Sequence, residues 1–174
     1  MFNITLLIAL FTLLLGGCGS DPAKPESSAP PPEPPKTLIE AQIMVSCQVN
    51  PDINGRPSPI VMRIFELKTL GKFEDADFYK LFNDYASVLG EDLIASEKFH
   101  LRPDDAKTIK NTVSPETKFI AIIAAYRDLN QAVWRGSIPI EAAKTNEFMV
   151  RLDQLSVTIT IPESPPNLNS APVN

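Results

Sequence analysis

The sequence has few of the side chains and charges on which enzymatic or nucleic-acid chemistry depends. Its 174 residues include one histidine, His100, and two cysteines. A single histidine excludes a metal site built from several histidines, and a Ser-His-Asp mechanism could use only this residue. Positive charge is also scarce, since the formal net charge is −5. This balance excludes a basic nucleic-acid footprint and a polybasic segment that would bind anionic lipid.

Motifs that bind cofactors, metals or phosphates are missing as well. The chain contains no P-loop, dinucleotide fingerprint, GxSxG elbow or zinc-ligand spacing. The adjacent acids Asp104 and Asp105 follow a proline, which favours a solvated turn over a catalytic carboxylate pair. Calcium remains a weaker possibility because Asp52 and Asn54 lie in one loop, although that loop lacks the spaced acids of an EF-hand. We therefore predict no cofactor, no metal and no catalytic residues.

The longest uncharged, mainly apolar stretch lies at the N-terminus. Residues 4–15 carry no charge but are too few to span a bilayer, which is typical of a signal peptide. They lead into Leu15-Gly16-Gly17-Cys18, which resembles a bacterial lipobox. The resemblance implies that residues 1–17 are removed and that acylated Cys18 holds the mature chain to a membrane. Gly19, rather than an aspartate, then favours the outer membrane; the alternative is an ordinary signal peptide with a chance cysteine.

Composition divides the mature chain into three parts. Residues 18–36 are rich in proline without large apolar side chains, which predicts a semi-rigid linker. Residues 162–174 carry four more prolines and predict a disordered tail. The segment 37–161 has the size of one domain. With Cys18 acylated, Cys47 is the only thiol left, so this domain must be stabilised by its core and not by a disulfide.

Within 37–161, short segments with strand signals dominate. Apolar residues occupy every second position from Ile39 to Val49, which predicts a half-buried strand and a buried Cys47. Further strands are predicted over 60–67, 93–101, 118–126, 132–140, 147–152 and 155–161. About seven short strands separated by turn residues favour an antiparallel β-sandwich, a mainly β fold.

One helix interrupts these strands. Four aromatic and aliphatic side chains fall at helical spacing on one stripe, namely Phe78, Leu81, Phe82 and Tyr85. Asp75 or Asp77 is suited to cap its start. We therefore predict a short inserted helix over 77–85, between the second and third strands.

Three arginines lie in or beside strands. Arg63, Arg127 and Arg135 are predicted to pair with carboxylates such as Glu66 or Asp128; contact with a partner is the alternative.

A set of longer motifs carries a family resemblance. The block over 49–67 reads VNPDINGRPSPIVMRIFEL, and it is followed by AAYRD at 124–128 and Trp134-Arg135. Together with the lipobox and the proline-rich linker, these motifs resemble the TssJ family, the outer-membrane lipoproteins of the bacterial type VI secretion apparatus.

The resemblance implies a transthyretin-like β-sandwich on the periplasmic face of the outer membrane. It also implies a protein partner, the periplasmic C-terminal region of the inner-membrane protein TssM, bound by the loop between the first two strands. That loop here spans Asn50 to Pro59, longer than the about two to five residues of a hairpin. Its prolines, Gly55 and the donor fork of Arg56 suit recognition. The candidate contact residues are Asn50, Pro51, Asp52, Ile53, Asn54, Gly55, Arg56, Pro57 and Ser58.

Two other functions remain open from the residues alone. A small secreted hydrolase would need His100 in a cleft beside a carboxylate. A carrier would hold an apolar ligand between the sheets.

Overall fold

The computed structural model describes residues 35–162. The predicted signal peptide, Cys18 and nearly all of the predicted linker and tail lie outside the described residues.

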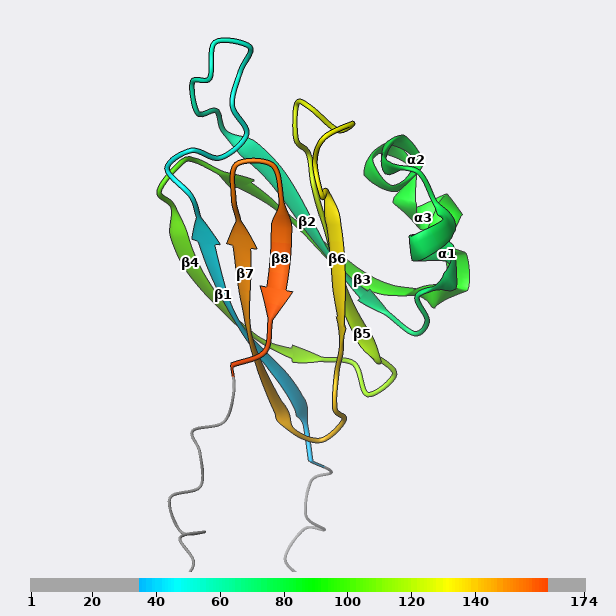
Figure 1. The fold of residues 1–174 in the computed structure, drawn as a ribbon. Coiled ribbons are helices and arrows are strands. Elements are labelled where there is room, and N and C mark those ends of the chain that lie inside the picture. The colour runs from blue at the N-terminus through cyan, green and yellow to red at the C-terminus, as the bar shows by residue number, and fades with distance from the viewer. Residues whose placement is uncertain (1–34, 163–174) are drawn as a thin grey trace, which may run out of the picture. The chain divides into compact units, whose positions relative to one another are not determined.

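Two four-stranded sheets face each other in the described domain, which confirms the predicted β-sandwich (Figure 1). Sheet A has the order β4 (Ala106–Val113), β1 (Thr37–Val45), β7 (Thr145–Leu152), β8 (Val157–Thr160). Sheet B has the order β3 (Leu93–Leu101), β2 (Ile60–Leu67), β5 (Phe119–Ala124), β6 (Arg135–Pro139).

Neighbouring strands are antiparallel except for β1 and β7, which run parallel along the whole length of β1 from Leu38. Strand β1 is central in sheet A, and its buried and exposed residues alternate as the sequence predicted. The inner faces of the two sheets form the main core, which includes Ile43 and Val150 of sheet A and Met62 and Ile122 of sheet B. Burial of such side chains stabilises the fold by about 1.5–3 kcal/mol each.

A second, smaller core lies on the outer face of sheet B, where short helices cover it (Figure 1). These are α1 (Gly71–Asp75), α2 (Phe78–Asn83), α3 (Tyr85–Leu89) and the 3₁₀ turn η1 (Gly90–Asp92). Asp77 caps α2, as predicted, by accepting a hydrogen bond of 2.9 Å from the Lys80 amide. The predicted single helix is divided at Asp84, whose backbone leaves the helical conformation.

The structure corrects two predictions made for side chains. Cys47 is exposed, because β1 ends at Val45 and the Val49 amide then donates to the Ser46 carbonyl, closing a turn that carries Cys47 outward. The carboxylate partners predicted for Arg63 and Arg135 were also wrong. Arg135 Nη1 donates to the carbonyls of Phe73 and Ala76, and the Arg63 guanidinium lies 4.2 Å from the ring centre of Tyr85.

The Tyr85 ring is tied to sheet B by polar as well as aromatic contacts. A hydrogen bond with Ser96 and the nearby charge of Arg63 lower the pKa of the Tyr85 hydroxyl. The Tyr126 hydroxyl, by contrast, donates to the Asp153 carbonyl, and burial raises its pKa.

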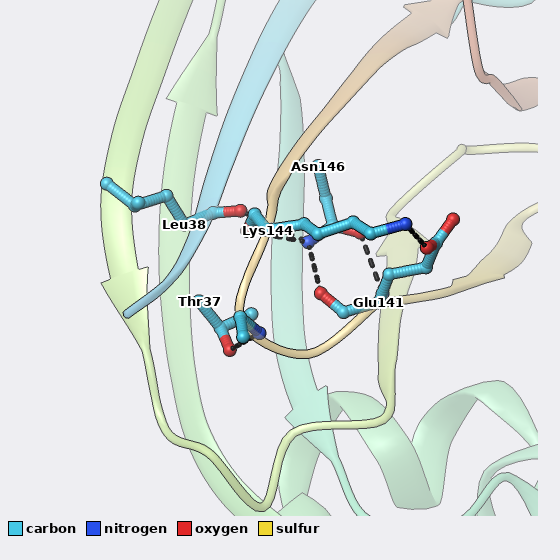
Figure 2. Close-up of polar contacts among 6 residues, drawn as sticks. Thr37, Leu38, Glu141, Lys144 and Asn146 are labelled. Atoms are coloured by element: carbon cyan, nitrogen blue, oxygen red, sulfur yellow. Dashed lines mark hydrogen bonds and ion pairs between the residues drawn. The ribbon is translucent and has the colours of Figure 1, made fainter. Parts of the chain in front are cut away.

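A network of hydrogen bonds holds the beginning of β1 to the turn between β6 and β7 (Figure 2). Thr37 Oγ1 accepts from the Ala143 amide at 2.9 Å, and the Leu38 amide donates to the Lys144 carbonyl at 2.9 Å. The Asn146 side chain braces this turn from within, since it accepts from the Glu141 amide and donates to the Glu141 carbonyl. The point at which the chain enters the domain is therefore fixed. Among the described helices, none is both long and apolar enough to cross a membrane.

Candidate functional site

The connection between β1 and β2, residues 46–59, projects from one end of the sandwich (Figure 1). Strand β1 begins at the other end of the domain and leads directly into this connection. The loop is thus held as far from Thr37 as the length of β1 allows.

The tip of the loop is closed by its own backbone. The Asp52 amide donates to the Arg56 carbonyl at 2.8 Å, and the Gly55 amide donates to the Asp52 carbonyl at 2.9 Å. Gly55 has a φ of 76°, a left-handed conformation that suits glycine. Asp52 Oδ1 accepts from the amides of Asn54 and Arg56 at 2.8 and 2.9 Å. These bonds give the tip a defined shape before any partner binds.

Arg56 completes this network instead of offering a free donor fork. Its Nε and Nη2 both lie 2.8 Å from Asp52 Oδ2. The backbone amide of Arg56, followed by its guanidinium, lowers the pKa of the Asp52 carboxyl below its usual range. Arg56 therefore orders the loop, a role that the sequence analysis had not given it.

Buried polar residues hold the base of the loop. Asn50 is 3% exposed and makes three hydrogen bonds to different segments. Its Nδ2 donates to the Pro59 carbonyl at 2.9 Å, its Oδ1 accepts from the Arg127 amide at 2.8 Å, and its own amide donates to the Gln154 carbonyl at 3.0 Å. Ser58 is also buried, and its amide donates to the Val49 carbonyl.

The side chains displayed to solvent lie at the tip. Ile53 is fully exposed, and Asn54, Gly55 and Pro57 are exposed beside it. Next to the tip is an open depression of about 620 Å³. It is lined by Pro51, Asp52, Ile53, Asn54, Arg56, Arg127, Asp128 and Leu155.

The structure gathers the nine predicted contact residues but gives them different roles. Asn50 and Ser58 are buried and support the base of the loop, whereas Asp52 and Arg56 determine the conformation of its tip. The other five residues line the depression or are exposed at the tip. Arg127 and Leu155 also lie beside this loop, a position that was not predicted for them. Arg127 could have been recognised as a candidate, because it is a charged residue directly after a long apolar run. No sequence pattern marks Leu155.

The residues that other functions would require lie elsewhere. His100 is exposed on β3, outside the depression beside the loop. Within residues 35–162, no three His, Cys, Asp or Glu side chains come together as metal ligands would. Asp52, which the calcium alternative required, is engaged by donors of its own loop.

A protein-family model described as "Type VI secretion lipoprotein, VasD, EvfM, TssJ" matches residues 37–155. None of the curated proteins matches the chain significantly.

Solved structures share the fold. The type VI lipoprotein TssJ1 from Pseudomonas aeruginosa has 30% identity and a TM-score of 0.73, with 75% of this chain and 100% of that chain covered. Serratia marcescens Lip, a membrane-bound component of the type VI secretion system, has 26% identity and a TM-score of 0.68. The match covers 74% of this chain and 99% of that chain. A chain in a structure described as the TssM C-terminal domain from EAEC has 20% identity and a TM-score of 0.57 over 71% and 98%, which shows the fold alone.

Proposed function

Because this chain belongs to the TssJ family of type VI secretion lipoproteins, we propose that it links the outer membrane to a TssM-like inner-membrane protein. The family is a structural component of the secretion system and not an enzyme family. The chain is therefore a binding module of the secretion apparatus.

The proposed partner is the periplasmic C-terminal region of the TssM-like protein, and the proposed contact is the tip of the β1–β2 loop. The observation that carries this proposal is a pre-ordered tip that displays a fully exposed Ile53. Ordering a loop in advance lowers the entropy lost on binding, and an exposed apolar side chain gains free energy when a partner covers it. The structure described as the TssM C-terminal domain, in which one chain has this fold, supports the choice of partner.

The proposed anchor is acyl chains on Cys18, with the mature protein on the periplasmic face of the outer membrane. The lipobox-like Leu15-Gly16-Gly17-Cys18 supports the acylation, and Gly19 supports the outer membrane. Membership of a lipoprotein family supports both.

Replacement of Ile53 by serine tests the loop contact. We expect Ile53→Ser in the full-length protein to weaken binding to the periplasmic C-terminal region of TssM by at least about tenfold, because a buried apolar anchor contributes more than about 1.4 kcal/mol. Biolayer interferometry measures the dissociation constant. Ile161→Ser, which removes another exposed isoleucine beyond the end of β8, is the matched control and should bind as wild type does. Unchanged affinity in a folded Ile53→Ser variant would exclude the loop tip as the contact.

A further inference from the structure

We propose that the partner contact extends beyond the β1–β2 loop onto two neighbouring loops, with Arg127 as a second contact residue. The proposed surface, here called the loop-end surface, consists of the loop tip (51–57), the β5–β6 loop (127–133) and the β7–β8 turn (153–156). It fits a partner segment that carries an apolar side chain beside a carboxylate. The inference rests on the proposed function, because its occupant is the same TssM-like protein.

Asn50 joins the three loops into one unit. Its buried side chain bonds the end of its own loop at Pro59 and the start of the β5–β6 loop at Arg127, while its amide bonds the β7–β8 turn at Gln154. Asn50 adopts a φ of 50°, which asparagine tolerates better than most residues. A buried side chain with all of these bonds satisfied fixes the positions of its partners. A protein that binds the tip therefore meets the other two loops in a set arrangement.

The β5–β6 loop and the β7–β8 turn are also bonded to each other. The Val133 amide donates to the Leu155 carbonyl at 2.9 Å, and the Val157 amide donates to the Val133 carbonyl at 2.8 Å. These bonds form an isolated parallel bridge between Val133 and Ser156. Val133 is thereby fixed beside Leu155, which lines the depression next to the loop tip.

Apolar side chains lie in all three loops at this end. Ile53 is fully exposed at the tip, and Val133 is 58% exposed although it precedes a strand. Leu155, half-buried, lines the depression of about 620 Å³ together with Pro51. The depression has a mixed lining, in which Pro51, Ile53 and Leu155 are apolar and the other residues are charged or polar, so it is suited to receive an apolar side chain that has a polar neighbour.

Arg127 supplies the charge. Within residues 35–162 its guanidinium has no hydrogen bond or ion pair, whereas Arg56 and Arg151 are paired with carboxylates. The nearby acids are engaged inside their own loops: Asp52 with Arg56, and Asp128 with the Gln131 amide. An exposed arginine in the lining of the depression can form a bidentate contact with one carboxylate of the partner, although it also lies close enough to Asp52 to help Arg56 lower the pKa of that carboxyl. The proposed occupant is therefore an apolar segment of the partner that carries one carboxylate opposite Arg127.

Replacement of Arg127 tests the inference, because only its backbone amide supports the fold. We expect Arg127→Ala in the full-length protein to weaken binding to the periplasmic C-terminal region of TssM by at least tenfold, or about 1.4 kcal/mol, and Arg127→Glu to weaken it further. The effect of Arg127→Ala should shrink at high salt, since screening weakens the wild-type contact. Lys110→Ala, which removes an exposed cation from β4, is the control and should change affinity less than about twofold.

The outcomes separate this inference from the function on which it rests. Wild-type affinity in Arg127→Ala, combined with weak binding in Ile53→Ser, would confine the contact to the loop and overturn the inference alone. Wild-type affinity in both variants would overturn the proposed loop contact as well. Loss of self-association in Arg127→Ala, with TssM binding unchanged, would assign the surface to a second copy of this chain and also overturn the inference.

Discussion

Asp52 shapes the loop tip because both of its carboxylate oxygens face donors of the same loop. Oδ1 accepts from two backbone amides, and Oδ2 lies 2.8 Å from two nitrogens of Arg56. All of these contacts favour the ionised carboxylate, and they therefore lower its pKa. The charge state of one side chain thus controls the order of the proposed binding loop.

Acid should loosen the loop only at strongly acidic pH. A carboxyl whose pKa is lowered in the folded state contributes stability that is complete above its ordinary pKa of 3.8 and is lost as pH falls through the lower folded value. We therefore expect an NMR titration of the Asp52 carboxyl to give a midpoint below 3.8. The amide signals of Asn54 and Arg56 should follow the same midpoint.

Arg56→Gln provides the control for this titration. It removes the guanidinium but keeps the backbone amide of residue 56, which is the larger cause of the shift. The pKa of Asp52 should rise in this variant and still remain below 3.8. A wild-type midpoint at or above 3.8 would show that the network does not form in solution.

Among the elements, the helical layer depends on one arginine of sheet B. Arg135 lies at the start of β6, and its Nη1 donates to the carbonyls of Phe73 and Ala76 at 3.1 and 3.0 Å. These carbonyls lie at the C-terminal end of α1, where a positive charge is favourable. The same guanidinium lies 4.8 Å from the ring centre of Trp134, which packs edge-on against Phe78 of α2.

Loss of the Arg135 guanidinium should detach the helical layer before it affects the sandwich. We expect Arg135→Ala to lower the free energy of unfolding by about 2 kcal/mol, because hydrogen bonds to a charged group are lost and two carbonyls are left without this donor. Urea denaturation measures this loss. Hydrogen exchange should accelerate in residues 71–89 and not in β1 or β7.

Arg151→Ala serves as the control for stability, since its ion pair with Asp153 is exposed and should contribute at most about 1 kcal/mol. Equal effects of the two substitutions would contradict the role of Arg135 in holding α1.

The elements also show which features of the fold can be predicted from sequence. The strand predicted over 60–67 coincides with β2, whose two faces pack into the two cores, and the predicted alternation in β1 is confirmed because one face of β1 packs into the main core. Strand β4 was missed, since only Ile109 and Val113 are buried along its length and an edge strand needs no full apolar face. The β1–β7 pairing joins segments about a hundred residues apart, and no local pattern reveals it.

The same limit applies to the candidate site. The length and composition of the loop, which depend on local residues, and the family resemblance indicated it as the candidate site. Its neighbours could not be predicted, since Asn50 meets Arg127 across 77 positions of sequence. Asp52 and Arg56 are close in the sequence, but their contact forms only in a particular turn conformation. Gly55 allows that conformation, but a glycine alone does not predict it.

At the scale of the whole molecule, the proposed function requires a membrane anchor at Cys18. We expect Cys18→Ser to move the protein from the membrane fraction to the soluble periplasm and to abolish labelling by a clickable palmitate analogue, because the acylated thiol is gone. Cys47→Ser is the matched control: its thiol is exposed, and its loss should leave both fractionation and labelling unchanged. Continued membrane fractionation of Cys18→Ser would refute the anchor.

The position of β1 between the linker and the binding loop has a mechanical consequence. In the proposed assembly, the membrane pulls on residue 36 and the partner pulls on the loop that follows Val45, so tension passes along the covalent backbone of β1. Nine residues in an extended strand span about 30 Å and can lengthen very little. Hydrogen bonds to β4 and β7 keep the strand straight on both sides. The domain would therefore transmit force between the membrane and the partner without lengthening. This force would not separate the two sheets.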